Sequence, residues 1–152
     1  MSVECKWPND LLIGGRKFCG ILLESSWRDL HANYIIVGIG INVNEESFPK
    51  ALQGKATSLR LESGKEFDRT ELLRDLLEGF EKEYLSAKAD GFDRILGEWE
   101  KRCPMLGKAV TVSQSGHAIS GKAIRLGADG ALILESQNGE MKVFAGDATV
   151  VG

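Results

Sequence analysis

The sequence predicts an α+β fold in which an antiparallel sheet with helices is followed by a small β-barrel. Residues 17–24 and 34–44 are rich in β-branched and apolar side chains, which is typical of neighbouring strands. Between residues 72 and 84, leucines and aromatic residues recur at spacings of three and four, which indicates a helix. After Pro104, short alternating segments separated by turn residues favour a β-rich tail.

The first 44 residues are expected to form consecutive antiparallel strands. The polar stretch 25–33 can turn the chain between the two strand segments. Upstream, residues 11–13 (LLI) are followed by Gly14 and Gly15, both of which tolerate a positive φ. This dipeptide therefore predicts a tight hairpin turn that leads into the next strand.

Residues 45–68 are polar and are interrupted by Pro49, Gly54 and Gly64. They predict a long surface connection with a short helical turn around 48–53.

The clearest predicted helix follows this connection. Asp68 and Glu71 form a plausible capping pair at its start, and Gly91 is a natural stop. A second, shorter helix is expected over 92–102, because the residue that precedes Pro104 is driven out of helical geometry. The apolar face of the first helix comprises Leu72, Leu73, Leu76, Leu77, Phe80 and Tyr84.

The tail is expected to form a closed or nearly closed barrel, because closure removes exposed strand edges. Turns are predicted at Ser115-Gly116, 128–130 and Asn138-Gly139. The boundary between the two domains is placed so that they span residues 1–104 and 105–152. The predicted strands of the tail are 108–113, 118–126, 130–135 and 140–145.

Composition excludes several classes of protein. The chain is 43% hydrophobic and 27% charged, as expected for compact soluble domains. It has no apolar run near the roughly 18–20 residues that span a bilayer and no secretion signal, so a cytoplasmic location is the default expectation. A net charge of −3 offers no field that would collect DNA or RNA.

The cysteines predict neither a disulfide framework nor a zinc site. Cys5, Cys19 and Cys103 are odd in number and show no CxxC spacing. We expect ordinary reduced thiols, because free cysteine commonly packs in protein cores.

Three glycines stand in otherwise apolar strand segments. Gly20, Gly38 and Gly40 cost packing and entropy there, so they indicate either bends and bulges or a flat ligand that approaches the backbone closely. Lys17, taken alone, is more simply interpreted as a solvated lysine beside a turn, because lysine is mostly exposed.

The asparagines and the acidic residue near these strands also have ordinary interpretations. Asn9 and Asp10 can form a turn after Pro8, and Asn42 and Asn44 can end a strand.

The segments KWPND (6–10), GRKFCGIL (15–22) and VGIGINVN (37–44), in this order, resemble the second half of the catalytic domain of biotin protein ligases. The helical pair and the terminal β-rich segment also match the rest of such a ligase, so the resemblance covers nearly the whole chain. It implies a partial class II synthetase-like antiparallel sheet with helices, followed by a Src-homology-3-like barrel.

The resemblance implies an activity and its partners. In that family, biotin and ATP form biotinyl-5′-AMP, which is transferred to a lysine of a biotin carboxyl carrier protein, and Mg²⁺ serves as activator. Lys17 stands at the position of the essential lysine, which bridges biotin and phosphate. The other implied contacts are Gly20, Leu22, Gly38 and Gly40 for biotin, with Lys17, and Asn9, Asp10 and Asn42 for the nucleotide phosphates, Lys17 or the magnesium.

The sequence also departs from the family pattern. The Gly-Arg-rich loop that covers the ligands has no counterpart, and only Arg16 lies near. The strands that precede KWPND are missing too, so the chain is expected to be a fragment, a split gene product or the result of a misannotated start.

The alternative is a catalytically incomplete module that binds biotin or the carrier, or that dimerises through its sheet. A lipoate ligase relative would be expected to lack KWPND. The tail either packs on the catalytic domain and completes a core, or it helps to close over ATP or to receive the carrier domain. No membrane or nucleic-acid partner is expected for this chain, and a homodimer stays open.

Overall fold

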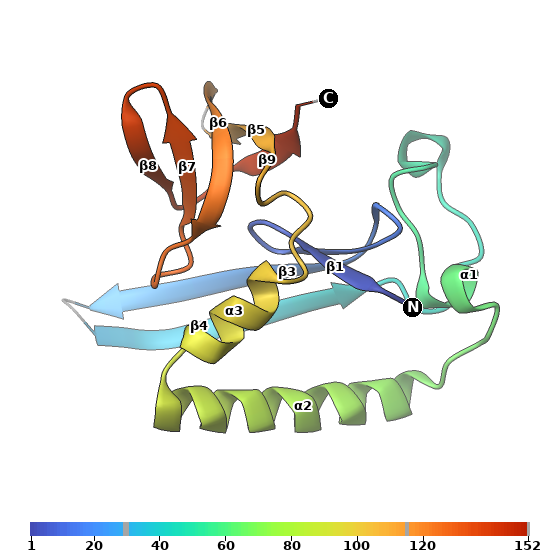
Figure 1. The fold of residues 1–152 in the computed structure, drawn as a ribbon. Coiled ribbons are helices and arrows are strands. Elements are labelled where there is room, and N and C mark those ends of the chain that lie inside the picture. Colours follow the sequence, from blue (N-terminus) through green and yellow to red (C-terminus); the bar gives the residue numbers. More distant parts are fainter. Residues whose placement is uncertain (29–30, 115, 152) are drawn as a thin grey trace. The chain divides into compact units, whose positions relative to one another are not determined.

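A computed structural model describes residues 1–28, 31–114 and 116–151. The chain divides into two compact units (Figure 1). The first comprises Met1–Val3 and Asn9–Phe67, and the second comprises Glu4–Pro8 and Asp68–Gly152. The two predicted helices, which both begin after Asp68, thus group with the second unit. The predicted assignment of 1–104 and 105–152 to family domains stays a prediction.

The first sheet is antiparallel where its register is defined, as predicted, with strand order β1-β2-β3-β4. Gly14 and Gly15 adopt φ values of 56° and 73° between β2 and β3, which confirms the predicted hairpin. In the predicted turn at 25–33, residues 29–30 lie outside the described residues. The strands are β1 (Val3–Lys6), β2 (Asp10–Ile13), β3 (Arg16–Arg28) and β4 (His31–Ile41).

The connection after β4 is more structured than the sequence predicted. The 3-10 helix η1 (Lys50–Leu52) falls within the expected helical turn, but α1 (Leu59–Ser63) was not expected. Thr57 and Ser58 are fully buried, so the prediction of a surface connection is wrong at this point. The reason is local: the Ser58 hydroxyl accepts the Leu61 N–H at 3.1 Å and caps α1.

Both predicted helices are confirmed. Helix α2 (Arg69–Asp90) begins after Asp68, whose carboxylate accepts backbone N–H groups of Thr70 and Glu71 at 2.7 and 3.2 Å. It ends at Gly91, and α3 (Asp93–Glu100) follows. None of the helices in the described part of the chain is long and apolar enough to cross a membrane.

The second sheet contains five antiparallel strands in the order β8-β7-β6-β5-β9. Positive φ values at Gly116 and Gly139 fit the predicted turns, although Ser115 lies outside the described residues. The last strand had no counterpart among the predicted segments. The strands are β5 (Ala109–Gln114), β6 (His117–Leu126), β7 (Leu132–Ser136), β8 (Gly139–Val143) and β9 (Asp147–Val150).

Of the predicted closed or nearly closed barrel, full closure is not found, because in the described part of the chain β8 and β9 are the two ends of the sheet and are not paired with each other. The sheet buries its apolar side without closure. Alternate residues such as Val110, Val112 and Leu132 are fully buried in a core that also contains Trp7 and Met105. Short edge strands then limit the exposed backbone.

Candidate functional site

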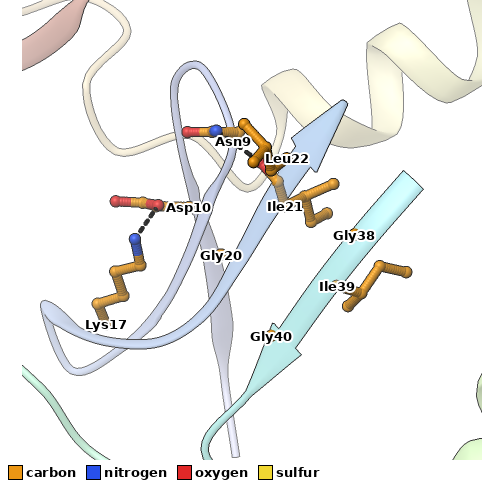
Figure 2. A pocket seen from close by; sticks show the side chains of 9 residues that line it. All are labelled: Asn9, Asp10, Lys17, Gly20, Ile21, Leu22, Gly38, Ile39 and Gly40. Atoms are coloured by element: carbon orange, nitrogen blue, oxygen red, sulfur yellow. Dashed lines mark hydrogen bonds and ion pairs between the residues drawn. The ribbon is translucent and has the colours of Figure 1, made fainter. Parts of the chain in front are cut away.

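An open pocket of about 460 Å³ lies on the first sheet where β3 and β4 carry their glycines (Figure 2). Gly20 pairs directly with Gly40, and Leu22 pairs with Gly38. Residues opposite each other in an antiparallel ladder lie on the same face of the sheet. Around Gly20, Gly38 and Gly40, this face is therefore nearly free of side chains. The pocket is lined by Asn9, Asp10, Lys17, Gly20, Ile21, Leu22, Gly38, Ile39 and Gly40.

The glycines do not mark bulges. The β3–β4 register runs without a shift from Cys19 to Ser26. An added Cβ at Gly38 would lie 3.6 Å from Leu22 O, and one at Gly40 would lie 3.8 Å from Gly20 O, both ordinary contacts. The chain itself therefore leaves the space above these glycines open, as a surface for a flat ligand requires.

A bulge does occur, but beside the lysine. Asp10 pairs with Gly20 and Leu11 with Cys19, whereas Leu12 pairs with Lys17, so Phe18 is the extra residue. In a regular strand, residues 17 and 20 would point to opposite faces. The extra residue brings Lys17 onto the face of Gly20.

The Lys17 ammonium forms an ion pair with Asp10, with Nζ 2.5 Å from Oδ1 (Figure 2). An added Cβ at Gly20 would lie 2.9 Å from Lys17 Nζ, so the ammonium lies directly over this glycine. The Asn9 side-chain amide donates to Ile21 O at 2.5 Å. A cation is therefore held at the edge of the glycine surface by a carboxylate from the neighbouring strand.

Asn42 is the predicted site residue that the structure does not bring into this lining. Its amide donates to Thr57 O at 3.0 Å, and its backbone N–H donates to Phe18 O at 2.8 Å. Arg16, at the start of β3, pairs with Glu62 at 2.7 Å.

The pocket holds no reactive thiol. Burial raises the pKa of the nearby Cys19 thiol, the positive charge of Lys17 opposes this shift, and Asp10 adds to it. Cys19 therefore stays protonated near neutral pH. No cluster of at least three metal-ligating side chains occurs in the described part of the chain.

Comparisons with known proteins agree with the resemblance seen in the three motifs. Residues 1–42 match the Biotin/lipoate A/B protein ligase family. The chain is 37% identical over 149 residues to the bifunctional ligase/repressor BirA of Bacillus spizizenii. The aligned region covers 97% of this chain and 46% of that protein. It is 35% identical over 147 residues to the biotin–[acetyl-CoA-carboxylase] ligase of Paracoccus denitrificans, 93% of this chain and 60% of that protein.

The chain belongs to the biotin protein ligase family. The fold agrees: the apo biotin protein ligase of Aquifex aeolicus superposes with a TM-score of 0.86 and 30% identity, over 98% of this chain and 65% of that one. The same enzyme in complex with biotin and ATP gives a TM-score of 0.84 at 29% identity, over 99% and 62%. The chain thus spans about half to two thirds of the length of the biotin protein ligases it matches.

Residues 55–57 lie against Lys17 and were not identified as site residues from the sequence. Ala56 forms an isolated parallel bridge with Lys17. A signal was present: Ser58 precedes a short apolar-polar segment that ends at Gly64, which is the pattern of a capped helix.

Proposed function

We propose that this chain supplies part of the active site of an ATP-dependent biotin ligase. The observation that supports the proposal is the Lys17 ammonium at the edge of a pocket whose floor is formed by facing glycines. The reaction joins two anions, so a cation that neutralises both lowers the barrier.

The chemistry has two steps. A carboxylate oxygen of biotin attacks the α-phosphorus of ATP and the bond to pyrophosphate breaks, which gives biotinyl-5′-AMP. The amine of a carrier-protein lysine then attacks the acyl carbon, AMP leaves and an amide forms. Lys17 would stabilise the charge on the phosphoryl oxygens in the first step.

The pocket floor suits a flat apolar ligand with a polar ring. Gly20, Gly38 and Gly40 would let the ureido ring and valeryl chain lie close to the backbone, and Leu22 would form a wall. Biotin and ATP are the ligands present in the complex of the Aquifex relative.

The nucleotide is assigned to the polar side of the pocket. Asn9 and Asp10 line it, and Asn42 follows β4 at the next position along the chain. Their oxygens are the hard donors that Mg²⁺ prefers. Since they are few, a magnesium ion held here would take most of its ligands from phosphate and water.

The runner-up is an incomplete module that binds biotin or carrier, or that dimerises. One observation favours it: the β3–β4 sheet leaves large apolar side chains exposed, and such patches mark interaction surfaces. They include Leu22, Leu23, Tyr34, Ile35, Ile36 and Val37.

Biotin-dependent pyrophosphate exchange and transfer to a carrier domain discriminate between these functions. The isolated chain is expected to be weaker by roughly two to four powers of ten than the same chain joined to the upstream half of the catalytic domain, since it lacks two or more charge-assisted contacts. Lys17→Ala should remove nearly all activity of the extended protein and leave a residual rate that is measurable only at high enzyme concentration. Near-full activity of the isolated chain would contradict the proposal that it supplies only part of the active site. An inactive extended protein would favour the incomplete binding module.

A further inference from the structure

The backbone of Lys17 is held from the side by the segment that follows η1. Lys17 N–H donates to Lys55 O at 2.8 Å, and Lys17 O accepts the Thr57 N–H at 2.9 Å. A bulge disrupts the regular ladder, so the backbone beside it is free to turn unless other bonds hold it. These two bonds fix the orientation of the residue that the bulge places beside Gly20.

Thr57 is itself held by a network of polar side chains. Its side chain is fully buried, and its hydroxyl donates to the Glu62 carboxylate, which also pairs with Arg16 at 2.7 Å. The Asn42 amide donates to Thr57 O at 3.0 Å. A buried hydroxyl is costly unless it is bonded, so this network specifies one position for the Thr57 backbone.

We infer that Thr57 is a positioning residue for Lys17, so that its hydroxyl sets the adenylation rate without contact with either substrate. The inference rests on the proposed function. Thr57 is not among the residues that line the pocket, and its hydroxyl bonds to the Glu62 carboxylate.

The test uses the extended protein and steady-state pyrophosphate exchange. Thr57→Val keeps the shape of the side chain but removes the donor, and kcat should fall about 10- to 100-fold because small misplacements of a catalytic group are costly. Thr57→Ser keeps the hydroxyl and should restore most of the rate.

Ser58→Ala is the matched control. Ser58 is equally buried, but its hydroxyl donates to Glu45 O at 2.6 Å and caps α1 rather than holding Thr57. The Ser58→Ala variant should lower the melting temperature about as much as Thr57→Val does, and its kcat should stay near that of the unsubstituted protein.

A double-mutant cycle separates positioning from general damage. In a Lys17→Ala background, measured at high enzyme concentration, Thr57→Val should have no further effect, because its route to the reaction is gone. If Thr57→Val lowers kcat by the same factor in both backgrounds, the inference is overturned. It is also overturned if Thr57→Val leaves kcat unchanged while the activity still depends on Lys17. Activity that is indifferent to Lys17→Ala overturns the proposed function and this inference together.

Discussion

Gly20→Ala should displace the Lys17 ammonium and leave the fold intact. The new methyl carbon would lie 2.9 Å from Lys17 Nζ and 3.5 Å from Asp10 Oδ1. Relaxed contacts of this kind lie near 3.5–4.0 Å, so the ammonium must move by roughly 0.6–1 Å. The movement is cheap for the fold, because the atom that yields is the end of a flexible side chain.

The cost falls on catalysis. A displacement of this size should lower kcat about 10- to 100-fold, which corresponds to about 1.4–2.7 kcal/mol of transition-state stabilisation. The free energy of unfolding should stay the same or rise by up to about 1 kcal/mol, because alanine restricts the unfolded chain. Pyrophosphate exchange on the extended protein and chemical denaturation measure the two quantities.

The neighbouring glycines provide the matched comparison. An added methyl at Gly38 or Gly40 meets only backbone oxygens at 3.6 and 3.8 Å, so Lys17 stays in place. These substitutions should instead fill the pocket floor, weaken biotin binding by about 1–3 kcal/mol and raise the KM for biotin roughly 5- to 150-fold. If all three variants alter KM and kcat alike, or if Gly20→Ala has no effect on kcat, the geometric reasoning is refuted.

Other expectations concern the thiols, the core and one surface carboxylate. Burial raises the pKa of each cysteine, so the native thiols should react slowly with a disulfide reagent at pH 8 and fully once unfolded; a fast native reaction would contradict this. Trp7→Ala should destabilise the second unit by about 3–5 kcal/mol in chemical denaturation, because it removes a large core side chain. Trp7→Phe keeps an aromatic ring but loses the 3.1 Å hydrogen bond to Gly130 O, which should cost about 1 kcal/mol. Equal losses of stability in the two variants would refute the packing argument. Hydrogen bonds from Lys101 and Arg102 lower the pKa of Glu98 from 4.5 to about 2. The stability that these bonds add is therefore present above pH 4.5 and is lost as the pH falls through 2. A titration midpoint of the Glu98 carboxylate near pH 4.5, measured by NMR, would show that the bonds do not form in solution. The three thiols are Cys5, Cys19 and Cys103.

Periodic elements could be predicted because one local rule decides each of them. The leucine spacing and Asp68 define α2. The glycine pair at 14–15 defines the hairpin, and alternation defines most strands of the tail. Barrel closure could not be predicted, because it depends on what covers the apolar face. That face also packs against Trp7, which lies more than 100 residues away from β5 in the sequence.

The candidate site shows the same limit. Motifs indicated that Lys17 and the strand glycines belong together, but a spacing of three between Lys17 and Gly20 is wrong for one face of a strand. The register shift that corrects it depends on pairing with β2. The polar sequence predicts a surface loop for residues 55–58, because polar residues are usually exposed. Only the structure shows that the hydroxyls of Thr57 and Ser58 are bonded and buried.

The motif KWPND combines two separate tasks in five residues. Trp7 is 3% exposed in the core of the second unit, and Lys6 pairs with Asp147 at 2.8 Å in that unit. Asn9 and Asp10 belong to the first unit and line the pocket. Substitutions two or three positions apart should therefore fail differently, since loss of Trp7 removes packing while loss of Asp10 releases the ammonium. Residues that occur together in a signature need not act at the same site.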